Sequence, residues 1–315
     1  MKAFIKTKYG GPEILSLQDV ESPLLQEDQL LVKVMANSAN PADWHLLRGK
    51  PYFARLTSGL FKPKEKIPGA DFAGVVVKTG KDVTRFKPGD KVFGETLMGG
   101  AFAEYVNVDE TVCEQMPEGV TFSVMAGVPV AGLTALQGLI THGKLKKGET
   151  VLINGSSGGV GHFAVQIAKA HGAIVTAVCS GKNLGFVKSL GADHVIAYDQ
   201  ENIHLHSGQY DLVIDTNGNL RHEDFQRMGK RGVTIGFTTM GHMLTLLLKS
   251  ALSKFPLAQF TAKANSQDLK LLASLIKDGK VHPHIEKSYT FQDIPVAIQY
   301  IETMRTKGKV VMVWD

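Results

Sequence analysis

The segment whose residues most clearly indicate a chemical role is a turn rich in glycine and serine at residues 156–161, which reads Ser-Ser-Gly-Gly-Val-Gly. An apolar run at 151–153 precedes it, and apolar residues recur at helical spacing between 160 and 168. The start of a helix exposes unpaired N–H groups and the positive end of the helix dipole, which together attract an anion. Glycine has no Cβ, so a phosphate can approach the backbone closely. The segment therefore predicts a phosphate site between a strand and a helix.

The spacing matches the dinucleotide pattern G-x-G-x-x-G, with Ser156 in place of the first glycine. In this pattern Gly158 lies beside the pyrophosphate and Gly161 allows the helix and strand to pack closely. The alternative is a tight turn that binds nothing, and its position within an alternating strand and helix segment argues against that alternative. The residues expected to hold the pyrophosphate are Ser157, Gly158, Gly159 and Val160.

The segment that follows the second strand predicts which dinucleotide binds. An NAD site usually places Asp or Glu about 20 residues beyond the glycines, where it accepts from the ribose hydroxyls. Residues 180–183 here are Ser-Gly-Lys-Asn, with no carboxylate. A hydroxyl and a cation suit a 2′-phosphate, which an acid would repel, so we expect NADPH rather than NADH. Ser180, Lys182 and Tyr198 are expected around that phosphate, although Lys182 is also compatible with a solvated surface charge.

Two different sequence patterns along the chain indicate the secondary-structure elements that position these groups. Residues 1–120 contain short valine-rich runs separated by Gly, Pro and Asp, which predicts a small β-barrel or sandwich. From about residue 123 strands and helices alternate, and the strands are almost continuously apolar. This predicts an α/β fold in which helices cover both faces of a doubly wound parallel sheet. An amphipathic helix at 268–280 follows, and the strand near residue 310 is expected to return to the first domain.

Composition excludes several classes of protein. The 315 residues suffice for two domains, and the net charge of +5 is spread along the chain rather than gathered into a nucleic-acid surface. The two cysteines cannot form a disulfide framework. The N-terminal segment lacks the apolar core of a signal peptide, and the apolar run at 243–248 is too short to span a membrane. A cytoplasmic location is therefore expected.

Motifs in sequence order extend the interpretation to almost the whole chain. They include "NSANPADWHLLRGK", "IPGADFAGVVVKTG", "NGSSGGVG", "LGADHVIAY" and "KGKVVMVW". In this order they resemble the medium-chain dehydrogenase/reductase superfamily, in its zinc-independent quinone oxidoreductase (ζ-crystallin-like) group. The resemblance implies a GroES-like catalytic domain at 1–126 and 265–315 and a Rossmann NADP-binding domain at 127–264, with the active site in the cleft between them. It also implies a homodimer or homotetramer.

The same resemblance suggests roles for further residues. Asn40 and Asp43 would lie near the nicotinamide, and Tyr52 would donate to the developing oxyanion. The alternatives are an Asx-type turn around Pro41 for the first two and simple packing for Tyr52. The remaining cofactor contacts implied are Thr134, Asn217, Gly236, Phe237 and Lys307, of which Thr134 is equally compatible with an ordinary helix hydroxyl.

The resemblance also bears on metal binding. Zinc enzymes of this superfamily place a Cys ligand in the segment at 37–43 and a His-Glu pair where this chain has Ala70 and Asp71. Neither the Cys nor the pair is present, and two cysteines cannot build a four-cysteine zinc lobe. We therefore expect no metal.

Without a Lewis acid, acceptors that need little polarisation are favoured. We expect hydride transfer from NADPH to a quinone or another conjugated carbonyl acceptor. The alternatives are an enone or alkenal double-bond reductase of the same fold, and a non-catalytic NADPH-binding protein similar to the crystallins.

Overall fold

The computed structural model describes residues 1–96, 98–236 and 239–314. Contacts divide the chain into two compact units, which are described separately here. The first unit comprises Met1–Ala131, Ala264–Lys277 and Pro283–Asp315. The second comprises Gly132–Lys263 and Asp278–His282. No helix in the described part of the chain is both long and apolar enough to cross a bilayer.

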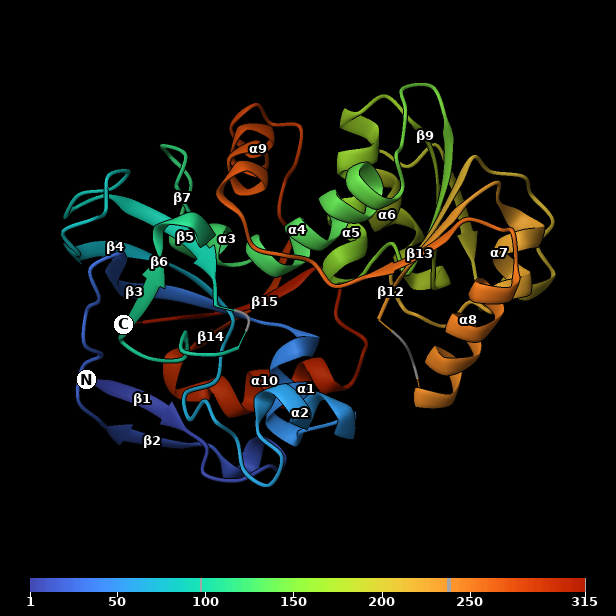
Figure 1. The fold of residues 1–315 in the computed structure, drawn as a ribbon. Coiled ribbons are helices and arrows are strands. Elements are labelled where there is room, and N and C mark those ends of the chain that lie inside the picture. The colour runs from blue at the N-terminus through green and yellow to red at the C-terminus, as the bar shows by residue number, and fades with distance from the viewer. Residues whose placement is uncertain (97, 237–238, 315) are drawn as a thin grey trace. The chain divides into compact units, whose positions relative to one another are not determined.

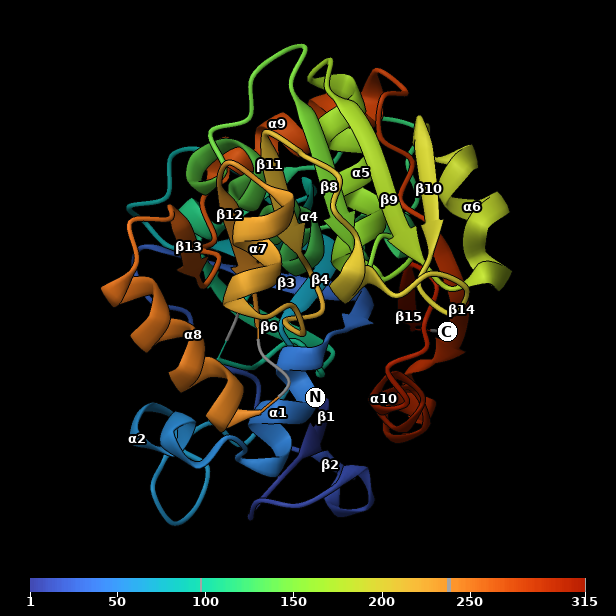
Figure 2. The same ribbon diagram turned by 90° about the vertical axis from the view of Figure 1, so that its right-hand side faces the viewer.

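The second unit is built on a parallel sheet of six strands (Figure 2). Every neighbouring pair in it is parallel, and the order is β10-β9-β8-β11-β12-β13. This is the order of a doubly wound dinucleotide-binding sheet, so the predicted fold class is confirmed. The strands are β8 (Thr150–Asn154), β9 (Ile174–Cys179), β10 (His194–Ala197), β11 (Leu212–Asp215), β12 (Gly232–Ile235) and β13 (Leu257–Phe260).

Helices connect these strands. The amphipathic pattern after the glycine-rich turn forms α5, whose Phe163, Ala164, Ile167 and Ala168 are buried against the sheet. The sequence analysis did not identify α7, α8 or β13. Apolar residues of α8 are exposed, so periodicity in that segment does not report a single buried face. The helices are α5 (Gly159–Ala170), α6 (Leu184–Ser189), α7 (His222–Met228) and α8 (Met240–Leu252), with a π-helix at Gln137–His142.

The first unit is mostly β. Its larger sheet has the order β14-β15-β3-β4-β5-β7, β6 also pairs with β3, and β1 pairs with β2 in a separate sheet (Figure 1). The strand near residue 310 runs antiparallel to β3, with Val310 opposite Ala39, as expected. The strands are β1 (Lys2–Ile5), β2 (Ser16–Asp19), β3 (Gln29–Ala39), β4 (Asp71–Thr79), β5 (Lys91–Glu95), β6 (Tyr105–Asp109), β7 (Cys113–Gln115), β14 (Ile285–Thr290) and β15 (Lys309–Val313).

Helices of the first unit include α1, which begins at Pro41 directly after β3. A proline in the first helical turn lacks an N–H that would be unpaired in any case, and the carboxylate of Asp43 accepts the N–H of Asn40 at 2.7 Å. The segment is thus a helix rather than an isolated turn, and it packs on α10 (Figure 1). The helices are α1 (Pro41–Arg48), α2 (Arg55–Ser58), α3 (Phe122–Ala126), α9 (Ser266–Lys277) and α10 (Ile294–Glu302), while α4 (Pro129–Leu136) spans the boundary between the units.

Candidate functional site

The glycine-rich turn is tied to the neighbouring strand before α5 begins. Gly155 has a φ of +81°, and the N–H groups of Gly155 and Ser156 donate to the carbonyl of Val178 at 3.1 and 3.0 Å. The hydroxyl of Ser156 donates to the same carbonyl at 2.8 Å. A Cβ added at Gly161 would lie 2.1 Å from the carbonyl oxygen of Gly155. The close packing expected at Gly161 is therefore found.

Gly158, the residue directly before α5, differs from Gly161 in having free space. A Cβ added at Gly158 would meet a single atom within 4 Å among the described residues, the carbonyl oxygen of Gly155 at 3.5 Å. Residues 157–160 are all partly exposed. The hydroxyl of Ser157 accepts from the side chain of Asn183 at 3.1 Å. The helix start is therefore accessible to an anion, as the pyrophosphate role requires.

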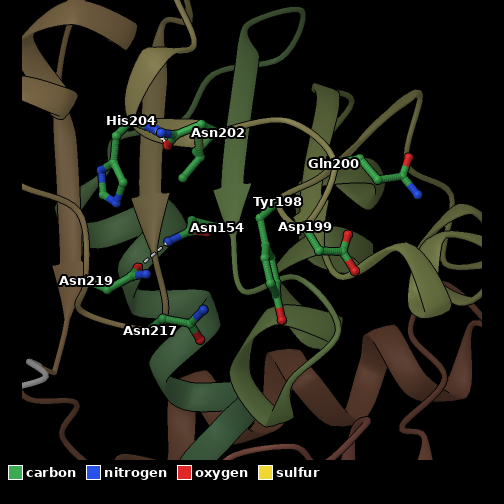
Figure 3. Close-up of a pocket in the computed structure, with 9 residues that line it drawn as sticks. Asn154, Tyr198, Asp199, Gln200, Asn202, His204, Asn217 and Asn219 are labelled. Atoms are coloured by element: carbon green, nitrogen blue, oxygen red, sulfur yellow. Dashed lines mark hydrogen bonds between the residues drawn. The ribbon is translucent and has the colours of Figure 1, made fainter.

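A cavity of about 640 Å³ lies at the carboxyl ends of β8, β10 and β11 (Figure 3). Strand order reverses between β8 and β11, and ligands of open α/β sheets bind at such a point. The cavity includes two of the residues predicted from sequence, Tyr198 and Asn217. Its lining residues are Asn154, Tyr198, Asp199, Gln200, Asn202, Ile203, His204, Asn217 and Asn219.

Asp215 fixes the loop that carries the asparagines of this cavity. It is fully buried and accepts from the side chain of Asn154 at 2.9 Å. It also accepts the N–H groups of Asn217 and Leu220, at 3.1 and 2.8 Å. Asn154 donates in addition to the side chain of Asn219 at 2.7 Å (Figure 3). Sequence reasoning identified Asn217 but missed the others, because a buried aspartate at a strand end has no distinctive local pattern.

Residues 180–183 themselves carry no acid, but the folded chain brings one beside them from another segment. Asp199, from the end of the neighbouring strand, accepts the N–H of Gly181 with both carboxylate oxygens, at 2.8 and 3.1 Å. Lys182 is exposed in the same turn. The turn at residues 180–183, where the 2′-phosphate is expected, therefore has both a cation and a carboxylate beside it. The sequence concealed this because β9 and β10 bring Gly181 and Asp199 together through strand pairing.

The other predicted cofactor residues of the second unit lie apart from the cavity lining. Thr134 is nearly buried in α4, at 8% exposure, and Ser180 is buried at the end of β9. Gly236 follows β12 with a φ of +71°, and none of the described atoms lies within 4 Å of an added Cβ. Phe237 lies outside the described residues.

In the first unit a buried polar cluster gathers side chains that are distant in sequence. Asp71, at the start of β4, accepts from the hydroxyl of Ser38 at 2.6 Å and from the amide of Asn40 at 2.8 Å. It also accepts the N–H of Val130 at 2.9 Å. The ammonium of Lys309, which is 3% exposed, lies 3.4 Å from Asp71 and donates a short hydrogen bond to the amide oxygen of Asn40.

This cluster changes the interpretation of Asn40. Its amide nitrogen donates to Asp71 and its amide oxygen accepts from Lys309, and the residue is 2% exposed. Asn40 therefore holds the cluster together and is not oriented toward a substrate oxygen. Tyr52 is 67% exposed, with the guanidinium of Arg55 5.0 Å from its ring centroid. Lys307 lies at the start of the closing segment, where its N–H donates to Glu286 at 3.0 Å.

Two carboxylic acids near this cluster are protonated at unusually high pH. Burial raises the pKa of Asp43 to about 7; the N–H of Asn40 opposes the rise, and the charge of Asp71 adds to it. Burial raises the pKa of Glu95 to about 8, with further contributions from Asp71 and Asp43 and an opposing one from Lys309. Sequence reasoning identified Asp43 but missed Glu95, because Glu95 ends an ordinary-looking strand, β5.

We expect the stability of the protein to fall as pH rises from about 4 to about 7 through Asp43. The carboxyl group ionises near pH 4 in the unfolded chain, whereas in the folded chain it keeps its proton to about pH 7. The free energy of unfolding therefore decreases as pH rises between these values. The loss is on the order of a few kcal/mol and is complete above the folded pKa. Urea unfolding of wild type and Asp43→Asn at pH 5 and pH 8 measures it.

The difference between the two proteins isolates this carboxyl group from histidines, which titrate in the same range. Asp43→Asn is expected to lose less stability than wild type between the two pH values. The exposed Asp19→Asn is the control and is expected to behave as wild type. An equal pH dependence in wild type and Asp43→Asn would contradict the raised pKa.

The side chains around Asp71 do not fit a zinc ion. Its carboxylate already has three donors and a neighbouring ammonium, and no group of three or more His, Cys, Asp or Glu side chains suited to a metal occurs in the described parts of the chain. Cys113 and Cys179 are both buried and unpaired, in different units.

A parallel sheet in dinucleotide-binding order, a helix start open to a phosphate and a β-rich unit with a buried polar cluster define the class of nicotinamide-dependent oxidoreductases. Residues 26–118 match the model of the alcohol dehydrogenase GroES-like domain, and residues 190–312 match that of the zinc-binding dehydrogenases. The chain belongs to the medium-chain dehydrogenase/reductase superfamily, in the group of quinone oxidoreductases and enone reductases.

Individual relatives cover nearly the whole chain. A 2-methylene-furan-3-one reductase of Solanum lycopersicum is 35% identical over 99% of this chain and 79% of its own length. An NADPH-dependent alkenal/one oxidoreductase of Arabidopsis thaliana, a chloroplast protein, is 34% identical with the same coverage. The solved structure of a quinone oxidoreductase from Coxiella burnetii has a TM-score of 0.88 and 31% identity, and covers 99% of both chains.

Proposed function

We propose that this enzyme transfers hydride from NADPH to a quinone or another conjugated carbonyl acceptor. The observation that carries the proposal is the accessible start of α5 beside a cavity at the switch point of the parallel sheet. Relatives named as NADPH-dependent alkenal/one oxidoreductases and quinone oxidoreductases support the cofactor and the acceptor class.

The chain's own residues divide the task of binding. The partly exposed residues 157–160 hold the pyrophosphate through the N–H groups at the start of α5. Tyr198, which lines the cavity, lies beside the 2′-phosphate of the bound cofactor. Ser180 and Lys182 attract the 2′-phosphate. The residues proposed for the nicotinamide end are Thr134, Asn217, Gly236, Phe237 and Lys307.

When bound, NADPH supplies the hydride, and the protein supplies orientation and electrostatic stabilisation. The exposed hydroxyl of Tyr52 donates to the oxygen on which negative charge develops. Asn40 and Asp43 act indirectly, since one links Asp71 to Lys309 and the other fixes the start of α1.

Replacing Tyr52 by Phe is expected to lower kcat/KM roughly tenfold without abolishing turnover, because one hydrogen bond to the oxyanion is lost. Steady-state kinetics with a quinone measures this. Complete loss of activity in folded Tyr52→Phe would instead identify Tyr52 as an essential proton donor.

NADPH oxidation with 1,2-naphthoquinone and with a short 2-alkenal tests the function and separates its two forms. Higher kcat/KM for the quinone supports the main proposal. Higher kcat/KM for the alkenal supports a double-bond reductase, which the furanone and alkenal relatives favour as the second candidate. Tight NADPH binding with negligible turnover of both compounds would contradict an enzymatic role.

We expect NADPH to bind more tightly than NADH, with Lys182 and Asp199 acting in opposite directions. Lys182→Ala should weaken NADPH binding roughly three- to tenfold and leave NADH nearly unchanged, since it removes a cation near the 2′-phosphate. Asp199→Asn should tighten NADPH binding, because it removes a negative charge near the 2′-phosphate. The amide oxygen can still accept the N–H of Gly181, so the turn should keep its structure. Fluorescence titration of both cofactors measures these Kd values. Lys188→Ala, an exposed lysine on α6, is the control, and equal Kd values for the two cofactors in wild type would contradict the assignment.

The proposal also assigns catalysis and cofactor binding to different domains of the chain. Residues 1–126 and 265–315 would form the catalytic domain and residues 127–264 the NADP-binding domain.

We further propose a homodimer or homotetramer in the cytoplasm. The assembly is supported by β13, an edge strand of the described sheet, and the compartment by two unpaired cysteines. Light scattering after size exclusion and cell fractionation test these two points, and a monomer or an organellar fraction would contradict them.

A further inference from the structure

The first unit contains a second cavity, of about 240 Å³, that the proposed reaction does not use. It lies among the segment after β1, the helices α1 and α2, and the segment that precedes β4. Its lining combines two lysines and a glutamate with hydroxyl and apolar side chains. The lining residues are Lys6, Leu46, Thr57, Ser58, Lys64, Glu65 and Met98.

Lys6 is the feature of this cavity that calls for a ligand. The residue directly follows β1, is 3% exposed, and its N–H donates to the carbonyl of Lys66 at 2.9 Å. Across the described ranges, its ammonium group makes no hydrogen bond and no ion pair. The side chain lines the cavity, so its ammonium presents a positive charge to whatever occupies this space. Burial accordingly lowers the pKa of Lys6, while the more distant charges of Asp43 and Glu65 oppose the change.

The remaining polar groups of the cavity do not satisfy this ammonium. The hydroxyls of Thr57 and Ser58 each donate to the carbonyl of Ala54 at 3.0 Å, so neither hydroxyl proton is available to a ligand in the cavity. Glu65 accepts the N–H of Ile67 at 3.3 Å. Lys64 is exposed at the same cavity. The two cations therefore face one carboxylate, which leaves a positive excess.

The apolar part of the wall limits what kind of anion fits. Leu46, on α1, and Met98 offer hydrocarbon surface next to the two lysines. The volume is below the usual range for drug-sized ligands, which begins near about 300 Å³. A compact ligand with one negative end and a short apolar body complements these walls.

We propose that this cavity binds a small carboxylate, whose oxygens pair with the ammonium of Lys6 and whose alkyl part lies against Leu46 and Met98. All of these residues belong to the first unit, and the proposal does not depend on NADPH. Charge-assisted hydrogen bonds of this kind are about twice as strong as neutral ones.

A titration of the apoprotein with butyrate, followed by two-dimensional NMR of the backbone amides, tests the proposal. Butyramide, the neutral analogue of the same shape, is the matched ligand. We expect saturable shifts at residues 46, 57 and 58 with a Kd on the order of 1 mM for butyrate, and binding of butyramide at least about tenfold weaker. Because NADPH is absent, the outcome is independent of whether the enzyme reduces quinones.

Variants then assign the effect to Lys6. Lys6→Met is expected to weaken butyrate binding at least about tenfold, and Lys6→Arg to keep it within about threefold, since the charge is retained. Lys8→Met removes an exposed lysine two residues away and is expected to leave binding unchanged.

Three results would overturn the proposal: equal binding of butyrate and butyramide, equal weakening by Lys6→Met and Lys8→Met, or no saturable shift with butyrate. If Lys6→Met does not fold, the comparison of the two ligands on wild type, together with Lys6→Arg, still decides the question.

Discussion

Gly161→Ala is expected to destabilise the second unit by about 3 kcal/mol or more. The added Cβ would lie 2.1 Å from the carbonyl oxygen of Gly155 and 2.6 Å from the Cα of Ser156, and both are backbone atoms that α5 and β8 hold in place. Alanine favours a helix by about 1 kcal/mol over glycine, but steric overlap of this size outweighs that gain. Thermal and urea unfolding measure the loss, and NADPH binding should weaken with it.

Gly158→Ala separates ligand approach from folding. Its Cβ would be 3.5 Å from the nearest atom described, so stability should change by less than about 0.5 kcal/mol. The same Cβ would keep a pyrophosphate from the N–H groups of α5, and we expect the Kd for NADPH to rise at least about tenfold. Gly185→Ala, on α6, is the control: no described atom lies within 4 Å of its added Cβ, so NADPH affinity should be unchanged while stability rises by up to about 1 kcal/mol through helix propensity. Wild-type NADPH affinity in Gly158→Ala would contradict the proposed pyrophosphate contact.

Lys309→Met is expected to cost roughly 3–5 kcal/mol of stability, the typical cost of breaking a buried ion pair on one side. The ammonium is 3% exposed and lies between Asp71, which is fully buried, and the amide oxygen of Asn40. Its removal leaves a buried carboxylate without a counter-charge and should raise the pKa of Asp43 and Glu95 further, since Lys309 lowers both. Urea unfolding at pH 8 is the measurement.

A double-mutant cycle shows whether the cost arises from the pair itself. Lys309→Met combined with Asp71→Asn should be less destabilised than the sum of the single variants, because no uncompensated charge remains. Lys78→Met, at an exposed position on β4, is expected to change stability by less than about 0.5 kcal/mol. Strict additivity of the two substitutions would show that Lys309 and Asp71 do not form a coupled pair.

The elements that local pattern controls were predictable. Continuous apolar runs predicted β8, β9 and β10, and the helical spacing after Gly158 predicted α5. These predictions were possible because the apolar pattern within each segment matches the surface that it buries. In contrast, α1 was not predicted. Its helix depends on the carboxylate of Asp43 and on packing against α10, which a short polar segment does not reveal.

The polar contacts of the site were less predictable, because they depend on which strands pair. Asp199 reaches Gly181 through the pairing of β10 with β9, and Lys309 reaches Asn40 through the pairing of β15 with β3. Lys6 looked like an ordinary surface lysine in a lysine-rich N-terminal segment, and its burial follows from packing around β1. Sequence spacing alone therefore indicated the pyrophosphate turn but not the charges around it.

The place of β15 in the sheet has a consequence for biosynthesis. The ribosome releases Lys309–Val313 after every other strand of this sheet, yet β15 lies between β14 and β3. The continuous stretch Gly132–Lys263 can fold as soon as it emerges, whereas the N-terminal β-structure must wait with the two sheet positions of β14 and β15 unfilled. During that delay the nascent chain exposes an unpaired side of β3, which makes translation the period when it most needs protection from aggregation.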